Sequence, residues 1–583
     1  METIRQTCTS INDSIGASTF GRIFRLEGSG HEKEIKNTKF LTEIRAGVTT
    51  FFTMAYIIAV NASILTDTGG TCVCNDTKDL TCSTDPVYNA CLLDLNRDLV
   101  TATAAIAGFS SFLFGFLTNM PVCLAPGMGL NAYFAYQVVG FHGTGSVSYR
   151  LALTAVFIEG FIFVFLSLIG MRQWLVKMLP SSVKIASGCG IGLFLAEIGL
   201  TYSAGIGAIT GATATPLDIA GCAPQYLDEN GFCTSHKMTN PTMWIGIFCG
   251  GIVTAYLMSF KVKSAIIIGI ALVSIISWPR PTSFTYFPYT TEGASRFDFF
   301  KKVVSFHPIN STLNALDWNV SSAPGHFILA LFTFLYVDII DCTATLYSMA
   351  RFAGVVDKES GDFPRSTLAY CTDAFCISIG ALFGCSPVTA FIESGAGIAE
   401  GGKTGLTAMT CGFCFLVSIF FAPIFASIPP WATGCTLILV GCMMIRQVVN
   451  VNWRYIGDAV PAFVTIMFIP FGYSTAYGLI AGIMVYTAIN VPVYLTKLVS
   501  RGRIVPDDED HREYWSLKPQ GKLPWFITAT QTVTGHFGHS SQAQDSAQSF
   551  RSGASQDNFT ASRGSNKDVE AVVVELPLRR EKR

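Results

Sequence analysis

Apolar segments of roughly 20 residues recur along most of this chain, and this recurrence limits the fold more than any other feature. A helix needs roughly 20 mostly apolar residues to cross the hydrocarbon core of a bilayer. Two further apolar regions, 120–140 and 385–402, are rich in Gly and Pro, which predicts broken spans that line a cavity. With them, the chain has about fourteen predicted crossings. The continuous spans are predicted at residues 43–65, 99–118, 149–170, 182–202, 243–260, 263–279, 326–348, 368–384, 405–427, 430–446, 456–472 and 474–498.

The composition also indicates a chain that lies in the lipid bilayer. Half of the 583 residues are hydrophobic and only 14% are charged, whereas charged residues make up about 25% of an average soluble protein. This balance argues against a water-soluble enzyme, and the repeated spans argue against a single-pass receptor. The formal net charge of −1 offers no basic excess for a phosphate backbone, so we expect no nucleic-acid partner.

The distribution of Lys and Arg predicts the orientation of the chain. Short cytoplasmic loops hold most of the positive charge in multi-pass proteins, and here only an even number of spans with both termini inside gives that result. The composition after the last span is typical of a disordered tail. We therefore predict a cytoplasmic tail at 1–42, a first seven-span repeat at 43–279, an extracellular loop at 280–325, a second repeat at 326–498 and a disordered cytoplasmic tail at 499–583.

The long outer loops contain cysteines. In the loop 203–242, Cys222 and Cys233 lie on a face that is oxidising in this orientation, where a disulfide would be stable. Two free thiols are the alternative, and the sequence leaves this pairing open.

Matching fragments in the two halves indicate an internal duplication. The pattern FTxxY at 52–56 recurs at 332–336, and fragments at 153–163 and 406–415 also match. A broken region takes the third place in each half. Because seven spans is an odd number, the two copies must have opposite orientations, which is the construction of many secondary transporters. Convergent composition of membrane helices is the alternative explanation.

Ionisable residues inside the spans are candidate functional groups, because each costs at least about 2.5 to 3.5 kcal/mol on insertion scales. Asp338 and Asp341 lie three residues apart, on one face of a predicted helix. Glu393 lies in the second broken region, where a carboxylate stabilised by a helix dipole is the alternative. For Asp338 the alternative is a partner for a distant polar group. Of the other acids in the spans, Asp373 is undecided, and a structural role is favoured for Glu159, Glu197 and Asp458.

The two broken regions predict a small polar pocket near the middle of the membrane. In the first, Gly129 precedes a helix start with unpaired N–H groups, and Asn131 supplies an amide that donates and accepts. In the second, Pro387, Thr389 and Glu393 take the corresponding place. A pocket with carboxylates and amides but no basic residue suits a neutral planar ring, although composition alone also permits a cation or a polyol. Aromatic residues that could stack on such a ring, although most will serve packing, are Phe51, Phe52, Tyr56, Tyr133, Phe134 and Tyr336.

Four runs of sequence resemble the AzgA-like purine permeases, a family that includes the fungal hypoxanthine, adenine and guanine transporter. The resemblance covers roughly residues 20–500 and implies a fourteen-span fold of two inverted repeats. It also implies a core domain of spans 1–4 and 8–11 and a gate domain of spans 5–7 and 12–14. Proteins of this fold often form homodimers through the gate domains, and the oligomeric state stays open. The runs are TMAYIIAVNASIL at 53–65, APGMGLNAYFAY at 125–136, FLYVDIIDCTATL at 334–346 and SPVTAFIESGAGIAEGGKTGLTA at 386–408.

The same resemblance implies an activity: proton symport of purine bases into the cell across the plasma membrane. It associates Asn131, Asp338 and Glu393 with purine binding, Gly129 and Pro387 with the shape of the site, and Asp341 with transport. Helix-start amides near Gly129 or Thr389 would donate to a ring acceptor. We expect the coupling proton on Asp341 first and on Glu393 second, with no metal or other cofactor.

Three alternative functions stay open at this stage. An anion transporter or channel of the same fold should bring a basic residue to the pocket, and the sequence shows none there. A membrane enzyme should show a His cluster or a nucleophile with a paired base, and the spans show neither. A purine sensor that does not transport is distinguished only by a measurement of flux.

Overall fold

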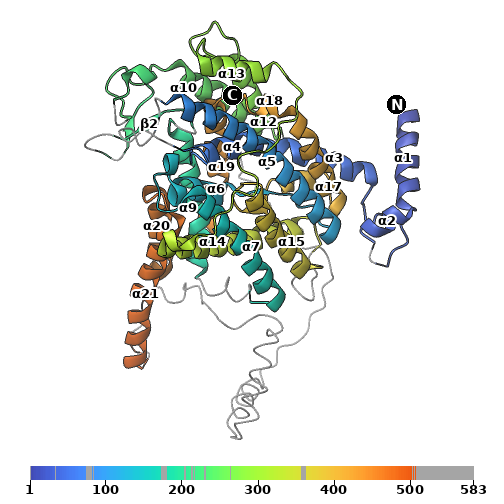
Figure 1. Cartoon of the computed structure of the whole chain (residues 1–583). Helices are drawn as coiled ribbons and strands as arrows, with labels where there is room; N and C mark the ends of the chain where they lie inside the picture. The colour runs from blue at the N-terminus through green and yellow to red at the C-terminus, as the bar shows by residue number, and fades with distance from the viewer. Residues whose placement is uncertain are drawn as a thin grey trace, which may run out of the picture. The chain divides into compact units, whose positions relative to one another are not determined.

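Figure 1 shows the computed structural model of the whole chain. It describes residues 2–503 and residue 506, apart from 33, 74–81, 83–84, 172–179, 203–204, 212–214, 216, 229–230, 263, 356–362 and 502. Contacts group all of these residues in one unit, Met1–Lys522. The tail predicted at 499–583 lies outside the described residues apart from 499–501, 503 and 506.

The described part of the chain contains nine helices that are long and apolar enough to cross a membrane. Three shorter apolar helices, α12 (Ala265–Ser277), α15 (Ser366–Leu382) and α20 (Ile456–Phe471), lie at three further predicted spans. The chain is therefore a helical multi-pass membrane protein. The long helices are α3 (Phe40–Met54) joined to α4 (Tyr56–Thr66), α5 (Pro86–Thr118), α7 (Tyr149–Ile169), α9 (Ser181–Leu200), α10 (Pro241–Ile245) continued by η4 (Gly246–Ile252) and α11 (Val253–Ser259), α14 (Pro324–Phe352), α17 (Gly405–Ser418) continued by η6 (Ile419–Phe421) and α18 (Ala422–Phe425), α19 (Pro430–Ile445) continued by η7 (Arg446–Asn450), and α21 (Thr475–Val499).

The sequence predicted an all-α membrane protein, but the described residues also contain four short strands. Each broken region folds as a strand of three residues followed by a short helix. A second strand pair, β2 with β3, lies in the predicted outer loop 203–242, and the predicted loop 280–325 contains a helix. These elements are β1 (Leu124–Pro126), α6 (Met128–Ala132), η1 (Tyr133–Val139), β2 (Ile209–Thr210), β3 (Asp218–Ile219), α13 (Thr291–Phe300), β4 (Val388–Ala390) and α16 (Ser394–Ala399), with α1 (Glu2–Gly16) and α2 (Thr19–Phe24) at the N-terminus.

The spanning helices pack in two sets. The first set contains α3, α4, α5, α7, α14, α15 and α17 together with β1 and β4, and the second contains α9 to α12 and α19 to α21. Within the first set, α5 packs on α17, and α15 packs on α7. By order along the chain, α15 in the second half corresponds to α5 in the first, and α17 corresponds to α7. The contact of α5 with α17 therefore corresponds to the contact of α15 with α7. A two-fold relation between the halves would produce this packing.

Glycines bring α5 and α17 of the first set into close contact. A methyl group at Gly405 would overlap the carbonyl oxygen of Gly115, and one at Gly412 would lie 2.7 Å from the carbonyl oxygen of Gly108. Small residues at such crossings let two membrane helices approach closely. The crossing therefore depends on the absence of side chains at these positions.

We expect Gly405→Ala to lower the stability of the folded chain in detergent, because overpacking of this kind costs about 1–3 kcal/mol. The measurement is the midpoint of thermal unfolding, followed by size-exclusion chromatography of the heated protein. Gly325→Ala is the matched control, since nothing lies within 4 Å of the added methyl group there. Equal midpoints for the two variants would show that the crossing tolerates the extra volume.

Two disulfides whose cysteines are both described lie at one end of the helix bundle, which we call the disulfide end. They join Cys72 to Cys91 and Cys222 to Cys233, so the pairing that the sequence left open is present. The first links the end of α4 to the start of α5, and the second lies in the loop after α9. This end therefore carries the C-terminal ends of α4 and α9.

The predicted loop 280–325 is anchored at the same end. Its helix α13 packs against α5 and α18. Near the start of α5, the buried Asp98 accepts hydrogen bonds from the backbone N–H groups of Asn310 and Ser311 at 3.0 and 2.7 Å. His307 Nε2 lies 2.9 Å from the same carboxylate. These contacts hold the loop across the end of the bundle.

Candidate functional site

The two broken regions meet through an antiparallel strand pair. Backbone hydrogen bonds extend the pairing on both sides, from the N–H of Gly127 to Pro387 O at 2.9 Å and from the N–H of Phe391 to Cys123 O at 3.1 Å. The pairing satisfies backbone groups that a break in a membrane helix would otherwise leave without partners. The facing residues are Leu124 with Ala390, Ala125 with Thr389 and Pro126 with Val388.

The first short helix begins earlier than predicted. Helix α6 starts at Met128, so Gly129 lies inside it and not ahead of it. A Cβ atom at Gly129 would lie 2.5 Å from the side chain of Ile191 in α9. Gly129 is therefore a point where the two sets of helices touch, and only a glycine fits. Further along α6, Asn131 is fully buried, and neither its amide oxygen nor its amide nitrogen has a hydrogen-bond partner.

Three acidic side chains from three helices form a buried cluster near the strand pair. Asp338 of α14, Asp373 of α15 and Glu159 of α7 have no exposed surface, and within the described residues none of their carboxyl oxygens makes a hydrogen bond of normal geometry. The Asp338 carboxyl group interacts electrostatically with the other two and lies beside Thr389 of β4. Glu159, for which a structural role was favoured, and Asp373, which was undecided, thus both lie beside a predicted binding residue. Buried polar groups without partners are rare and call for an explanation.

Glu393 lies next to this cluster, directly before α16. Its Oε1 accepts a hydrogen bond of 3.0 Å from the hydroxyl of Tyr56, which is almost fully buried. Its carboxyl group also interacts electrostatically with that of Asp341. Tyr56 was one of six aromatic residues that could stack on a ligand, most of them expected to serve packing; in the structure its hydroxyl donates to the Glu393 carboxylate.

We expect Tyr56→Phe to weaken ligand binding at this site about tenfold, because a hydrogen bond to a charged group contributes about 1.5–3 kcal/mol. The dissociation constant of a labelled ligand measures this change. Tyr149→Phe is the matched control, since its hydroxyl donates to the Gly384 carbonyl oxygen and to no carboxylate. An equal dissociation constant in the two variants would show that the hydroxyl of Tyr56 does not position Glu393 for binding.

A cavity of about 410 Å³ lies between the two sets of helices. This volume is within the range of about 300–1,000 Å³ that is usual for small-molecule sites. Asp341 is exposed in the cavity. The lining residues are Gly129, Leu130, Val337, Ile340, Asp341, Thr345, Ser348 and Ile392 from the first set, and Lys184, Ser187, Gly188, Ile191, Met444, Gln447, Asn450 and Leu479 from the second.

The predicted site residues divide between the cavity and the packed helices behind it. Gly129 and Asp341 line the cavity, whereas Asn131, Asp338, Pro387, Thr389 and Glu393 are not among its lining residues. Asp338 and Asp341 were predicted to share one helix face, but only Asp341 reaches the cavity. Val337 and Ile392, each adjacent in sequence to a predicted carboxylate, form the wall between the cavity and the polar groups.

Lys184 is a lining residue that the sequence prediction missed. No basic residue was expected at the site, yet Lys184, in the first turn of α9, lines the same cavity as Asp341. In the sequence, Lys184 could not be distinguished from the basic residues of the predicted cytoplasmic loops. Gln447 and Asn450 add amide groups to the same wall. The cavity thus contains one acidic and one basic side chain, with polar groups able to donate and accept.

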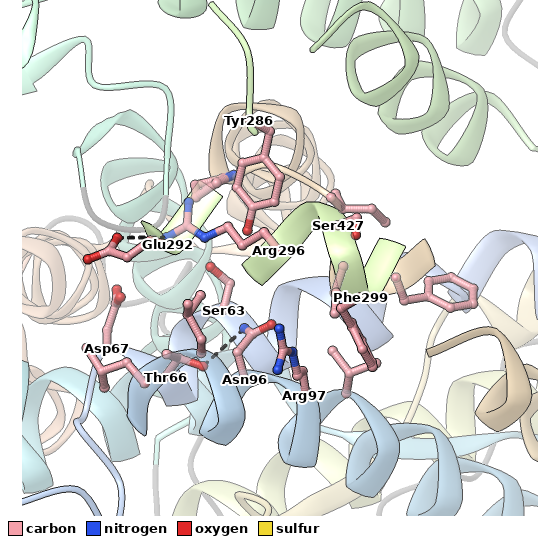
Figure 2. Close-up of a pocket in the computed structure, with 18 of the residues that line it drawn as sticks. Ser63, Thr66, Asp67, Asn96, Arg97, Tyr286, Glu292, Arg296, Phe299 and Ser427 are labelled. Carbon is pink, nitrogen blue, oxygen red and sulfur yellow. Dashed lines mark hydrogen bonds and ion pairs between the residues drawn. The ribbon is translucent and has the colours of Figure 1, made fainter. Parts of the chain in front are cut away.

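A separate cavity of about 220 Å³ lies at the disulfide end, between α4, α5 and α13 (Figure 2). Its charged and polar groups largely pair with their own neighbours. Arg97 bonds Asp94 at 2.8 Å, and Asn96 donates to Thr66 at 3.1 Å. Figure 2 also shows Arg296 beside Glu292, 3.9 Å apart. None of the predicted site residues is among those that line this cavity.

A helical membrane bundle in which two strand-broken segments meet beside a cavity defines a membrane transport protein. The comparison with known proteins agrees. The chain belongs to the xanthine/uracil permease family, whose model, described as a permease family, matches residues 87–480. Members of this family are permeases and not enzymes.

Relatives cover nearly the whole chain. The "Efflux pump notK'" of Aspergillus versicolor is 57% identical over 96% of this chain and 97% of its own length. A protein of Schizosaccharomyces pombe, provisionally named a xanthine/uracil permease, is 56% identical over 87% of this chain and 81% of its own. The guanine/hypoxanthine permease PbuO of Bacillus subtilis is 33% identical over 79% and 93%.

A solved structure shares the fold. The transmembrane domain of the cyanobacterial bicarbonate transporter BicA superposes with a TM-score of 0.50 over 76% of this chain and 97% of that domain, at 16% sequence identity. At this identity the similarity concerns the fold alone.

Proposed function

We propose that this protein is a proton symporter of the plasma membrane that imports hypoxanthine, adenine and guanine by alternating access. Its family supports the transport of nucleobases, and relatives at 30–33% identity are named permeases for guanine and hypoxanthine or for adenine. The resemblance of the four sequence runs to the AzgA-like permeases supports the choice of purines and of proton coupling. Both termini are cytoplasmic in this proposal.

One observation carries the proposal. Beside the β1–β4 pair, Asn131, Asp338 and Thr389 bury polar atoms that make no hydrogen bond of normal geometry in the described part of the chain. Leaving such atoms unpaired costs about 1–3 kcal/mol each. A purine base offers ring N–H donors and ring acceptors on adjacent edges, so it can pair with a carboxylate, an amide and a hydroxyl together. The unpaired atoms are the binding groups for this ligand.

The fold supplies the movement. In our proposal the chain crosses the membrane fourteen times as two inverted seven-span repeats, with the first set of helices as the core and the second as the gate. Gly129 of the core touches Ile191 of the gate, and the 410 Å³ cavity separates the two sets further along. Rocking of one set against the other would then open the polar groups to each side in turn.

Asp341 and Glu393 couple the proton in this mechanism. Asp341 lines the cavity, and its carboxyl group interacts with that of Glu393 at the start of α16. Two acidic groups that interact bind protons as a pair. A proton that binds Asp341 from the cavity therefore changes the charge beside Glu393. This change alters the affinity of the site for a base.

The experiment is uptake of radiolabelled hypoxanthine by cells without endogenous purine transport, at two external pH values and with a protonophore. We expect uptake to rise at acid pH, to collapse with the protonophore, and to be inhibited by adenine and guanine. Inhibition by xanthine or uracil would assign a related specificity. Absence of saturable uptake in cells that display the protein at the surface would contradict the proposal and favour a sensor.

Export is a second candidate function, because the relative at 57% identity is named an efflux pump. Cells preloaded with labelled hypoxanthine distinguish the two directions. Under an inward proton gradient, an importer retains the label and an exporter releases it faster than control cells do.

Transport of an anion is favoured by one residue, Lys184, which lines the cavity. Sulfate and bicarbonate are therefore included as competitors. Inhibition of hypoxanthine uptake by either anion at millimolar concentration would assign the cavity to anions, and we expect none, since Asp341 balances the charge.

A further inference from the structure

One face of α9 connects two different cavities. Lys184, Ser187, Gly188 and Ile191 line the 410 Å³ cavity, and Glu197 and Thr201 line another. With Phe194 between them, the positions 184, 188, 191, 194, 197 and 201 are spaced by three or four residues, so they follow one stripe along the helix. With a rise of about 1.5 Å per residue, the stripe from Lys184 to Thr201 extends about 25 Å. The second cavity therefore lies toward the disulfide end, well separated from the first.

The second cavity has a volume of about 380 Å³ and walls of aromatic side chains. Phe141 lies in the segment between η1 and α7, which is tied to the end of α4 by the hydrogen bond from His142 N–H to Asp67 O at 2.7 Å. The other walls come from the second set and from the loop that carries the Cys222–Cys233 bond. A ligand there would contact this segment as well as the second set. The aromatic residues are Phe141, Tyr202, Phe232, Phe471 and Tyr473.

Glu197 is the acidic group in this cavity. Its side chain is only 9% exposed, and its Oε2 has no hydrogen-bond partner. Tyr473 donates a hydrogen bond to the carboxylate. Burial and this neighbour raise the pKa of the Tyr473 phenol, so its hydroxyl stays protonated and remains a hydrogen-bond donor. The Oε2 atom of Glu197 is then left to accept a hydrogen bond from a different donor. In the described part of the chain, no Lys or Arg is among the residues that line this cavity.

An aromatic contact lies between the two cavities. Phe194, between Ile191 and Glu197 on the stripe, is fully buried and packs edge-on against Tyr473 with ring centroids 5.4 Å apart. Tyr473 is thus both a wall of the second cavity and a partner of Phe194, which lies between the two cavities along the stripe. Movement of α9 relative to the turn at Tyr473 would separate the two rings.

We propose that the second cavity is a binding site for a planar nitrogen heterocycle that donates N–H groups from one edge, which is the chemistry of a purine base. The ring lies among the aromatic side chains, whose faces stack on flat ligands, and an edge N–H donates to the unpaired Oε2 of Glu197. The site holds the base at the disulfide end until the Phe194–Tyr473 contact opens. The assignment to purines rests on the proposed function, while the assignment to flat N–H donors rests on the cavity alone.

The test is equilibrium binding of tritiated hypoxanthine to the purified full chain in lipid nanodiscs. We expect two sites per chain in the wild type, and one in Asp338→Asn, which removes the central site. Adding Glu197→Gln to Asp338→Asn should weaken the remaining binding about tenfold or more, because a hydrogen bond to a charged acceptor is lost. Adding Phe232→Ala, a change in the loop, should weaken it as well without a change in helix packing.

Asp458→Asn is the matched control, because Asp458 is a buried acid of the second set that pairs with Asn452 and lines neither cavity. In the Asp338→Asn background it should leave the remaining site unchanged. A single site in the wild type that Asp338→Asn abolishes overturns the second site and leaves the proposed function intact. Residual binding that is displaced by tetramethylammonium shows a cation cage and also overturns the inference. No hypoxanthine binding to the wild type overturns both proposals.

Discussion

We expect hypoxanthine uptake to fall about a hundredfold or more when Asp338 is replaced by asparagine. The change keeps the size of the side chain and removes the charge, so each N–H of the base that donates to the carboxylate loses about 1.5–3 kcal/mol. It also places an amide group beside Asp373, Glu159 and Thr389. The N–H groups of this amide would compete with those of the base for the oxygen acceptors of these three residues. The measurement is the initial rate of uptake, divided by the amount of protein at the cell surface.

Asp458→Asn serves as the control for this variant as well, because Asp458 is just as buried but its Oδ2 already accepts from Asn452 at 3.0 Å. We expect near wild-type uptake from the control. If Asp338→Asn transports normally at equal surface expression, the buried acidic cluster is a structural feature and the binding groups lie elsewhere in the cavity.

Replacing Asp341 with asparagine is expected to abolish concentrative uptake while exchange of substrate continues. One charge that crosses 100 mV supplies about 2.3 kcal/mol, which sustains nearly fiftyfold accumulation. Without a proton site on the cavity wall this driving force is lost, and the internal concentration should rise only to the external one. Proteoliposomes with an imposed potential measure the accumulation, and counterflow of labelled against unlabelled hypoxanthine measures the exchange.

Ser348→Ala is the control for Asp341, since Ser348 lines the same cavity and is exposed but binds no proton. We expect it to keep both accumulation and exchange. Accumulation by Asp341→Asn that still collapses with a protonophore would transfer the coupling role to Glu393.

The spans were predictable because each is a local property of the sequence. Apolar runs of the right length placed all of the long helices, and the Gly and Pro content of 120–140 and 385–402 marked the two breaks. The strands in these breaks were not predictable. The pairing of Ala125 with Thr389 joins residues more than 260 positions apart, and three-residue strands leave no period in the sequence that indicates which partner they face.

The site was predicted in part for the same reason. Asp338, Asp341 and Glu393 stood out as charges in apolar surroundings, and Gly129 stood out beside Pro126. The approach of Glu159 and Asp373 to Asp338 depends on the packing of α7, α14 and α15, which no single segment encodes. Lys184 could not be predicted as a cavity residue, because a basic residue near the end of a span has the same neighbouring sequence whether it lies in a loop or lines a cavity.

The strand pair at the centre of the site has a consequence for how the protein is made. While the ribosome synthesises the first half, β1 enters the membrane with no partner for its backbone groups, because residues 388–390 do not yet exist. Unpaired N–H and C=O groups are costly in lipid, so this segment must wait in the insertion machinery or be shielded by neighbouring helices. Completion of the binding site is therefore a late event in biogenesis. A chain that stops before β4 would carry an unfinished strand, by which cellular quality control could recognise it.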